Sequence, residues 1–246
     1  MTRTLCLLAA FTLTPALATA QVVDVFVPVA PDQAESDQAD LGQVLSEAAP
    51  STVVPTEEAG WIPLFNGKDL TGWKASENPE TFSVVDGLIV AHGDRAHLFY
   101  TGDVNGGEFK DFELWVEVKT EPGSNSGVYF HTAWQDEGWP MKGYEVQVNQ
   151  THGDPRKTGG LYAIVDVMDV SPVEDNEWYV EHITVTGKRI VVRVNGEVTV
   201  DYTEPAGAVR EGRVAERLLD KGTFALQGHD PDSVVRYRQV WVKPLD

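Results

Sequence analysis

The sequence predicts an all-β fold, an antiparallel β-sandwich or jelly roll. From residue 61 onward, short runs of alternating apolar and polar residues follow one another at regular spacing, and each is bounded by Gly, Asn, Asp or Pro. Only residues 209–219 have helical periodicity, so a single short helix is expected between strands. Strands in such a series, without helices between them, pair in antiparallel sheets that pack face to face.

Two dipeptides mark tight hairpins. Asp86-Gly87 and Asn195-Gly196 each lie between two apolar runs, and both dipeptides readily adopt the positive φ angles that two-residue hairpin turns need. Gly187-Lys188 leads into the second hairpin, which predicts a three-stranded meander. The predicted strands are, in chain order, 82–85, 88–90, 112–118, 128–131, 144–148, 179–186, 190–194, 197–202, 223–227 and 234–242.

The first 59 residues differ in composition from the rest. Arg3, an apolar stretch at 5–17 and a small-residue cleavage site at 18–20 predict a signal peptide over residues 1–20, so the mature protein is expected in the periplasm or outside the cell. Residues 21–59 contain eight acidic residues and no Lys or Arg, which predicts a disordered acidic linker. The remaining residues, 60–246, are expected to form the folded domain.

The charge and the cysteine content exclude several classes of function. The chain has 38 Asp and Glu against 19 Lys and Arg, a net charge of −19, and this charge repels nucleic acid. The single cysteine, Cys6, lies in the predicted signal peptide, so the mature protein has neither a disulfide nor a cysteine nucleophile. No stretch after the predicted signal is long and apolar enough for a membrane helix. A neutral or cationic ligand is therefore expected.

Strand alternation places a row of polar side chains on one open sheet face. In the predicted strand 144–148, Glu145 and Gln147 are two positions apart and therefore both face away from the core. The same alternation predicts that side chains of two further strands project from this face, and such a mixture of hydrogen-bonding and flat aromatic groups suits a hydroxyl-rich ligand. The residues expected on the face are Tyr129, His131, Glu145, Gln147, Asn149, Gln227 and His229.

Three further side chains complete the expected site. Trp134 and Trp139 lie in a loop after the 128–131 strand, where an indole can stack on a sugar ring. Arg238 is an expected substrate-binding residue, or else an ordinary ion-pair partner of Glu145. No cofactor is evident, because no Asp-rich loop of the kind that binds hard cations occurs, although a divalent metal stays an option.

Seven motifs spread over residues 60–246 resemble, in order, those of the 3-keto-disaccharide hydrolase family. They are WIPLFNGKDLTGW at 61–73, FSVVDG at 82–87, GEFKDFEL at 107–114, NSGVYF at 125–130, GYEVQV at 143–148, GGLY at 159–162 and VNG at 194–196. Each motif alone is weak, but the set is specific.

The resemblance implies a concanavalin A-like jelly roll that acts on glycosides carrying a ketone at C3. Such a ketone acidifies the C2 hydrogen, so one base can remove it, the aglycone can leave from C1, and water can add back. The base is expected to be Glu145, with His131 as its nearest rival. Two other classes stay open: a noncatalytic carbohydrate-binding module of the same fold, and an assembly protein tethered by the acidic leader.

Overall fold

The structure, a computed structural model, describes residues 54–245. All of these belong to one compact unit, Ala48–Asp246. The predicted signal peptide and the predicted linker up to residue 53 lie outside the described residues. None of the helices in the described part of the chain has the length and hydropathy that a membrane span requires.

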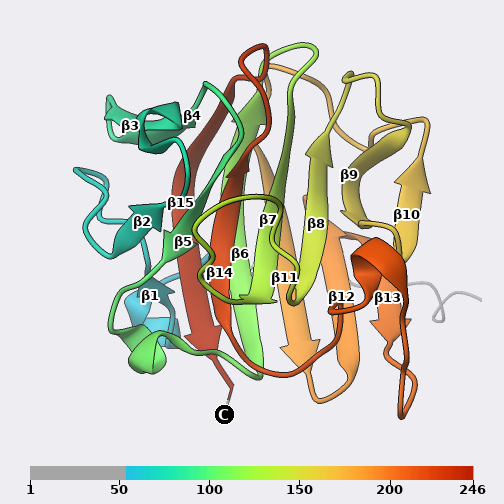
Figure 1. The fold of residues 1–246 in the computed structure, drawn as a ribbon. Coiled ribbons are helices and arrows are strands. Elements are labelled where there is room, and N and C mark those ends of the chain that lie inside the picture. Colours follow the sequence, from blue (N-terminus) through green and yellow to red (C-terminus); the bar gives the residue numbers. More distant parts are fainter. Residues whose placement is uncertain (1–53, 246) are drawn as a thin grey trace, which may run out of the picture. The chain divides into compact units, whose positions relative to one another are not determined.

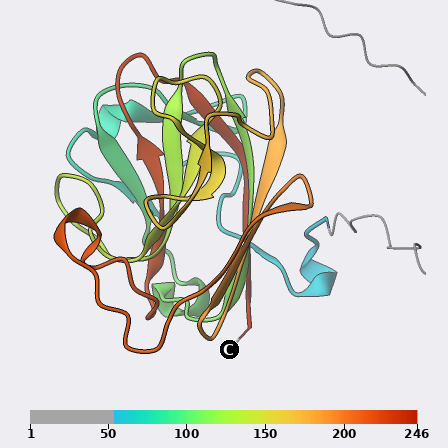
Figure 2. The same cartoon turned by 90° about the vertical axis from the view of Figure 1, so that its right-hand side faces the viewer.

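The described residues form two antiparallel sheets that lie in two layers (Figures 1 and 2). One sheet has the order β13-β12-β11-β6-β15-β4-β3, with β1 alongside β15, and the other has the order β10-β9-β8-β7-β14-β5-β2. The first sheet comprises β1 (Ile62–Pro63), β3 (Phe82–Val85), β4 (Leu88–Ala91), β6 (Phe112–Thr120), β11 (Tyr179–Thr186), β12 (Arg189–Val194), β13 (Glu197–Thr203) and β15 (Val235–Pro244). The second comprises β2 (Trp73–Ala75), β5 (Ala96–Tyr100), β7 (Asn125–Thr132), β8 (Tyr144–Asn149), β9 (Arg156–Leu161), β10 (Val165–Met168) and β14 (Thr223–Gly228).

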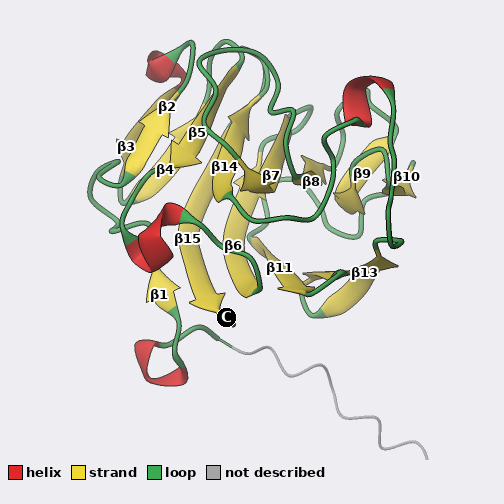
Figure 3. Cartoon of the chain, turned by 60° about the horizontal axis from the view of Figure 1, so that its bottom comes forward, coloured by secondary structure: helices red, strands yellow, loops and turns green. Residues whose placement is uncertain are grey.

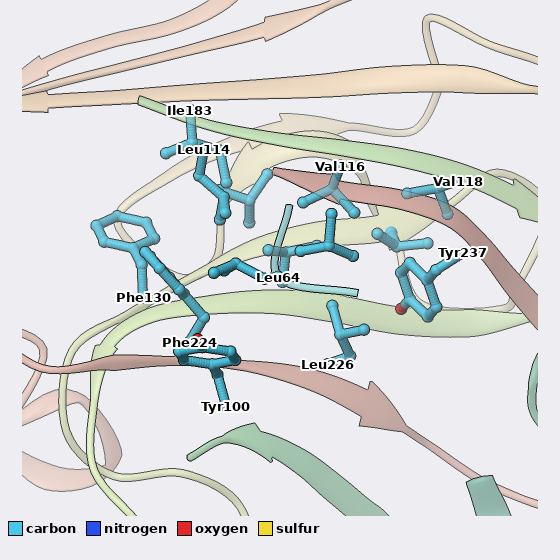
Figure 4. Packing of buried hydrophobic residues seen from close by; sticks show 14 of the residues in the cluster. Leu64, Tyr100, Leu114, Val116, Val118, Phe130, Ile183, Phe224, Leu226 and Tyr237 are labelled. Carbon is cyan, nitrogen blue, oxygen red and sulfur yellow. The ribbon is translucent and has the colours of Figure 1, made fainter. Parts of the chain in front are cut away.

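The core fills the space between the two sheets (Figure 4). Phe130, Phe224 and Leu226 of the second sheet point toward Leu114 and Ile183 of the first. Burying one such side chain contributes about 2 kcal/mol, so the packing of these inner faces is the main source of stability in a domain whose described residues contain no cysteine. The outer face of the second sheet is therefore free to carry a polar site.

Both predicted hairpin turns are confirmed. Asp86 and Gly87 have φ angles of 52° and 77°, and they join β3 to β4. Asn195 and Gly196 have φ angles of 50° and 90°, and they join β12 to β13. Positive φ at both central residues gives a turn whose twist matches that of the flanking strands, which is why these dipeptides identified the hairpins.

The predicted helix at 209–219 is wrong. The described residues contain only short 3₁₀ helices (Figure 3), and in this region the helix η4 covers just Gly212–Val214. Gly212 has a φ of 63°, a left-handed conformation that interrupts an α-helix. Downstream, the Leu219 amide donates to Glu204 Oε2 at 2.7 Å, so contacts with distant residues determine the path of this segment. The other 3₁₀ helices are η1 (Glu57–Ala59), η2 (Pro79–Thr81) and η3 (Val104–Gly107).

Candidate active site

A pocket of about 780 Å³ lies on the outer face of the second sheet. Its floor comes from β7, β8 and β14, and its walls come from the loop at 135–141, from residues 154–163 and from residues 213–217. This volume is within the range typical of small-molecule sites. The lining residues with polar or charged side chains are Asn125, Tyr129, Gln135, Glu137, Trp139, Glu145, Gln147, Asp154, Arg156, Tyr162, Arg213, Arg217, Gln227 and His229.

The register of the strands explains why distant residues meet in this pocket. Tyr129 of β7 lies directly opposite Glu145 of β8, and Gly127 lies opposite Gln147. Residues opposite one another in an antiparallel pair project from the same face, so β7 and β8 present one continuous polar surface. The structure thus brings together Tyr129, Glu145 and Gln147 as the alternation of polar and apolar residues predicts.

Glu145 is the most buried acid of the pocket, with 4% of its surface exposed. Its Oε2 accepts from Arg217 Nη2 at 2.9 Å, and its Oε1 accepts from Gln227 Nε2 at 3.0 Å. Burial raises the pKa of the Glu145 carboxyl, while the charge of Arg217 and the hydrogen bonds to the carboxyl oppose that rise. A carboxylate whose proton affinity is raised by burial is a stronger base than one in water.

Gly127 provides the space that Glu145 occupies. A Cβ added at position 127 would lie 2.6 Å from Glu145 Oε1 and 2.9 Å from its Cγ. The Glu145 side chain therefore lies across the backbone of β7, where only a glycine leaves room.

Arg217 is a residue of the site that the sequence did not reveal. Its guanidinium lies between the rings of Tyr129 and Tyr162, 5.9 Å and 5.5 Å from their centroids, and it is paired with Glu145. Arg217 comes from the irregular segment after η4, 72 residues from Glu145 in the chain. Neither alternation nor a local motif could have placed it there.

A second polar group lies beside the first. Gln147 Nε2 donates to Asn125 Oδ1 at 2.8 Å, and Asn125 Nδ2 lies 3.2 Å from His152 Nδ1. His229 follows β14 and lines the pocket, as strand alternation predicts. Its Nδ1 lies 2.5 Å from Asp230 Oδ2, which leaves Nε2 as the ring nitrogen free of that bond. The pocket thus holds both hydrogen-bond donors and hydrogen-bond acceptors along its floor.

His131 does not project from this face, so this prediction is wrong. Its φ of 54° breaks the alternation of β7, and a register shift in the β7–β14 pairing accompanies the break. The ring instead lies beside Phe112, 5.6 Å away, and its Nε2 lies 2.8 Å from the carbonyl oxygen of Lys110. Burial lowers the pKa of His131. His131 is not among the residues that line the pocket.

Three other residues that were expected in the site, Asn149, Trp134 and Arg238, do not line the pocket. Asn149 Nδ2 donates to the carbonyl oxygens of Asp154 and Arg156 at 3.0 Å and 2.7 Å, so this side chain braces the loop before β9. Trp134 packs against Phe99, with ring centroids 5.2 Å apart.

Arg238 belongs to the other sheet. It lies on β15, where its guanidinium pairs with Glu117 of β6 and stacks on Trp178. It therefore cannot be the ion-pair partner of Glu145, which is Arg217. The strand pattern in the sequence indicated that Arg238 lies on a strand, but it does not say which sheet that strand joins.

One cluster in the described residues has the donor atoms of a metal site. His152, His229 and Asp230 each offer a ligand atom, and these atoms lie within 4.8 Å of one another. However, the Asp154 amide donates to His152 Nδ1 at 3.1 Å. A neutral imidazole that accepts at Nδ1 carries its proton on Nε2, so this ring offers a metal no lone pair in the arrangement described. The cluster does not fit a metal without rearrangement.

Comparison with known proteins decides the family. A model of the 3-keto-alpha-glucoside-1,2-lyase-like domain matches residues 60–243. The chain belongs to this family. A 3-keto-disaccharide hydrolase of Bacteroides thetaiotaomicron is 26% identical over 242 residues, which cover 80% of this chain and 82% of that protein. The resemblance drawn from the seven motifs is thus confirmed.

Solved structures confirm the fold. A crystal structure from Parabacteroides distasonis, provisionally assigned as a glycosyl hydrolase, has a TM-score of 0.65 at 24% identity and covers 78% of this chain and 99% of its own. A Bacillus subtilis protein with a galectin-like fold has a TM-score of 0.52 at 13% identity, covering 74% of this chain and 94% of its own. The described part of this chain therefore shares the all-β sandwich fold of these structures.

Proposed function

We propose that this protein cleaves 3-keto-glycosides by removing the C2 proton, eliminating the aglycone and hydrating the product. The observation that carries the proposal is the position of Glu145: a buried carboxylate, held by Arg217 and Gln227, on the floor of a pocket in a member of this family. A preorganised base of raised proton affinity is the group that the first step requires.

The reaction needs one base and a donor to the leaving oxygen. Glu145 accepts the proton from C2, the C1–O bond to the aglycone breaks, and the aglycone oxygen takes up a proton. Water then adds across the C1–C2 double bond, with its hydroxyl at C1 and its hydrogen at C2. The products are a 3-keto-sugar and the free aglycone. Because the leaving group departs by elimination, the second carboxylate of an ordinary glycosidase is not required.

The arginine and the amides of the floor hold the reacting atoms in place. Arg217 keeps the Glu145 carboxylate in one orientation, and Gln227 fixes its second oxygen. Gln147 and Asn125 present amide groups to sugar hydroxyls on the same floor. Trp139, with 40% of its surface exposed, lies at the wall of the pocket.

A noncatalytic carbohydrate-binding module is the less favoured alternative. The Bacteroides thetaiotaomicron relative, whose match covers 80% of this chain, is named a hydrolase. A binding module gains nothing from a buried, ion-paired carboxylate, whose desolvation is costly.

Incubation of the purified protein with 3-keto-maltose and with maltose tests the proposal. We expect release of glucose and 3-keto-glucose from the oxidised disaccharide and no cleavage of maltose, with the products followed by mass spectrometry. Equal cleavage of the two sugars would contradict the elimination mechanism. Saturable binding of 3-keto-maltose without turnover would favour the binding module.

A further inference from the structure

His97 lies on the same sheet face as the pocket, although it does not line the pocket. It belongs to β5 and lies directly opposite Gln227 of β14 in the strand register. Gln227 in turn bonds Glu145, so His97 is the next side chain in the polar row beyond the proposed catalytic group. Its backbone is satisfied by Ser76, whose hydroxyl accepts from the His97 amide at 2.9 Å.

The His97 imidazole is a buried polar group without a partner. It has no exposed surface, and neither Nδ1 nor Nε2 has a hydrogen-bond partner among residues 54–245. Burial lowers the pKa of His97 to about 3, so the ring is neutral at physiological pH. A neutral imidazole has one N–H donor and one acceptor nitrogen. Burying both ring nitrogens without hydrogen bonds costs folding free energy, and such a group in a native structure calls for an explanation.

Trp139 covers this histidine. The indole lies 5.5 Å from the ring of His97 and 5.2 Å from the ring of His229, so it fills the gap between two imidazoles. Two further aromatic rings, Tyr129 and Phe99, enclose His97 at 5.4 Å and 6.3 Å. Trp139 also lines the pocket, so its indole contacts both the pocket and His97.

The loop that carries Trp139 is weakly held. Within the described chain, the tip at 135–141 makes one hydrogen bond to a residue outside its own loop, from the Gly138 amide to Glu77 Oε1 at 3.0 Å. Its other hydrogen bonds lie within the loop: Gln135 donates to the carbonyl oxygens of Glu137 and Trp139, the Met141 amide donates to Gln135, and Trp134 Nε1 donates to Asp136. Few hydrogen bonds therefore oppose movement of this loop, and the contacts that displacement of Trp139 must break are those of its ring with His97, His229 and Arg95.

We propose that His97 forms a second sugar-binding subsite, in which a neutral hexose ring displaces Trp139 and hydrogen-bonds the imidazole. A sugar hydroxyl both donates and accepts, so it matches the two unused ring nitrogens, and a hexose is comparable in size to the indole it replaces. On the proposed function, which this assignment takes as its basis, the subsite receives the sugar that leaves.

Binding of maltose and of methyl α-D-glucoside, measured by NMR titration, tests the subsite without requiring turnover. We expect wild-type protein to bind maltose more tightly than the one-ring glucoside. In His97→Phe this preference should fall about thirtyfold, because two neutral hydrogen bonds are lost, about 2 kcal/mol together. His97→Gln, which keeps one donor and one acceptor, should restore part of the preference. His182→Gln, on the other sheet, is the matched control and should leave it unchanged.

A second measurement tests whether Trp139 shields His97 from solvent. Trp139→Ala should expose the imidazole, so the pKa of His97 should rise from about 3 toward the ordinary value of 6.5, as followed by the ring proton shifts. The proposal is overturned if the maltose preference survives in His97→Phe, if wild-type protein shows no preference, or if His97 stays neutral at pH 5 in Trp139→Ala. Failure to cleave 3-keto-maltose, with the maltose preference intact, would refute the proposed function and leave the subsite standing.

Discussion

At the scale of single residues, the site depends on how Glu145 is held. Its carboxylate is buried, bonded on one oxygen to Arg217 and on the other to Gln227, and it lies over the backbone at Gly127. Each of these neighbours affects a different property: Gly127 its position, Arg217 its proton affinity and Gln227 its orientation. The three properties can therefore be tested separately.

Gly127→Ala should displace the Glu145 carboxylate. The added methyl would meet Oε1 at 2.6 Å, and a base moved by about 1 Å loses about 10²-fold in turnover. The measurements are turnover of 3-keto-maltose, which should fall, and the thermal midpoint, which should stay close to the wild-type value. The control is Gly153→Ala, where an added Cβ meets no heavy atom within 4 Å. Equal turnover in the two variants would show that the Glu145 side chain accommodates a methyl group at position 127.

Arg217→Met should move the acidic limb of the pH–rate profile upward. Burial already raises the pKa of Glu145, and the charge of Arg217 opposes that rise, so its loss raises the pKa further. The base works only when ionised, and hence activity should appear at a higher pH than in the wild-type protein. The profile of kcat/KM against pH measures this. Arg189→Met, which breaks an exposed pair with Asp201 on the other sheet, should leave the limb in place. An unshifted limb in Arg217→Met would remove Glu145 as the titrating base.

At the scale of elements, period-two alternation predicted most strands and the face on which each side chain lies. It placed Tyr129, Glu145 and Gln147 together because their strands are regular and adjacent. It failed at His131, where one residue with positive φ turns the side chain inward. Strands β1, β2, β5, β9 and β10 were not predicted. β1 and β2 span only two and three residues and β9 contains Gly159 and Gly160, so these three show no clear alternating pattern.

Strand β11 carries a buried acid whose removal should stabilise the protein. Glu181 has no exposed surface, neither carboxylate oxygen has a partner among the described residues, and burial raises its pKa well above the ordinary value. Because the native state then holds a proton that the unfolded state releases, stability falls as pH rises above about 4.5, the unfolded value. Glu181→Gln removes the ionisable group and with it this decrease of stability with rising pH.

We expect Glu181→Gln to raise the free energy of unfolding by about 1 to 2 kcal/mol at pH 8 and to leave it nearly unchanged at pH 4. Urea unfolding at the two pH values measures the difference. Glu197→Gln, at an exposed position of β13, is the control and should show no such dependence. A loss of stability at pH 8 would mean that the Glu181 carboxylate is ionised and has found a partner.

At the scale of the whole molecule, the pocket combines a rigid sheet floor with irregular walls. The sequence predicted the floor, but Arg217 reaches it from a segment whose path depends on distant residues such as Glu204. Such long-range contacts have no local pattern, which is why one sequence indicated the fold and the face and could not identify the ion-pair partner. The predicted export signal and acidic linker stay predictions.

A chain that begins at Val54 should keep the thermal midpoint of the chain that begins at Gln21. The shorter chain lacks residues 21–53 of the predicted linker, 21–59. The charged residues in this stretch are all acidic and it has little bulky apolar surface, so it should add nothing to the core. Differential scanning calorimetry of the two proteins measures this. A midpoint several degrees lower in the shorter chain would show that the acidic segment packs on the sandwich.

The most direct test of the central claim is exchange of the C2 hydrogen of 3-keto-maltose with deuterated water, followed by NMR in wild-type protein and in Glu145→Gln. This substitution keeps the shape of the side chain and removes its basicity. We predict that exchange and cleavage both fall about 10²-fold or more in Glu145→Gln, while binding of 3-keto-maltose is retained. Near-normal exchange in Glu145→Gln would contradict the account, because the proton would then be removed by another group.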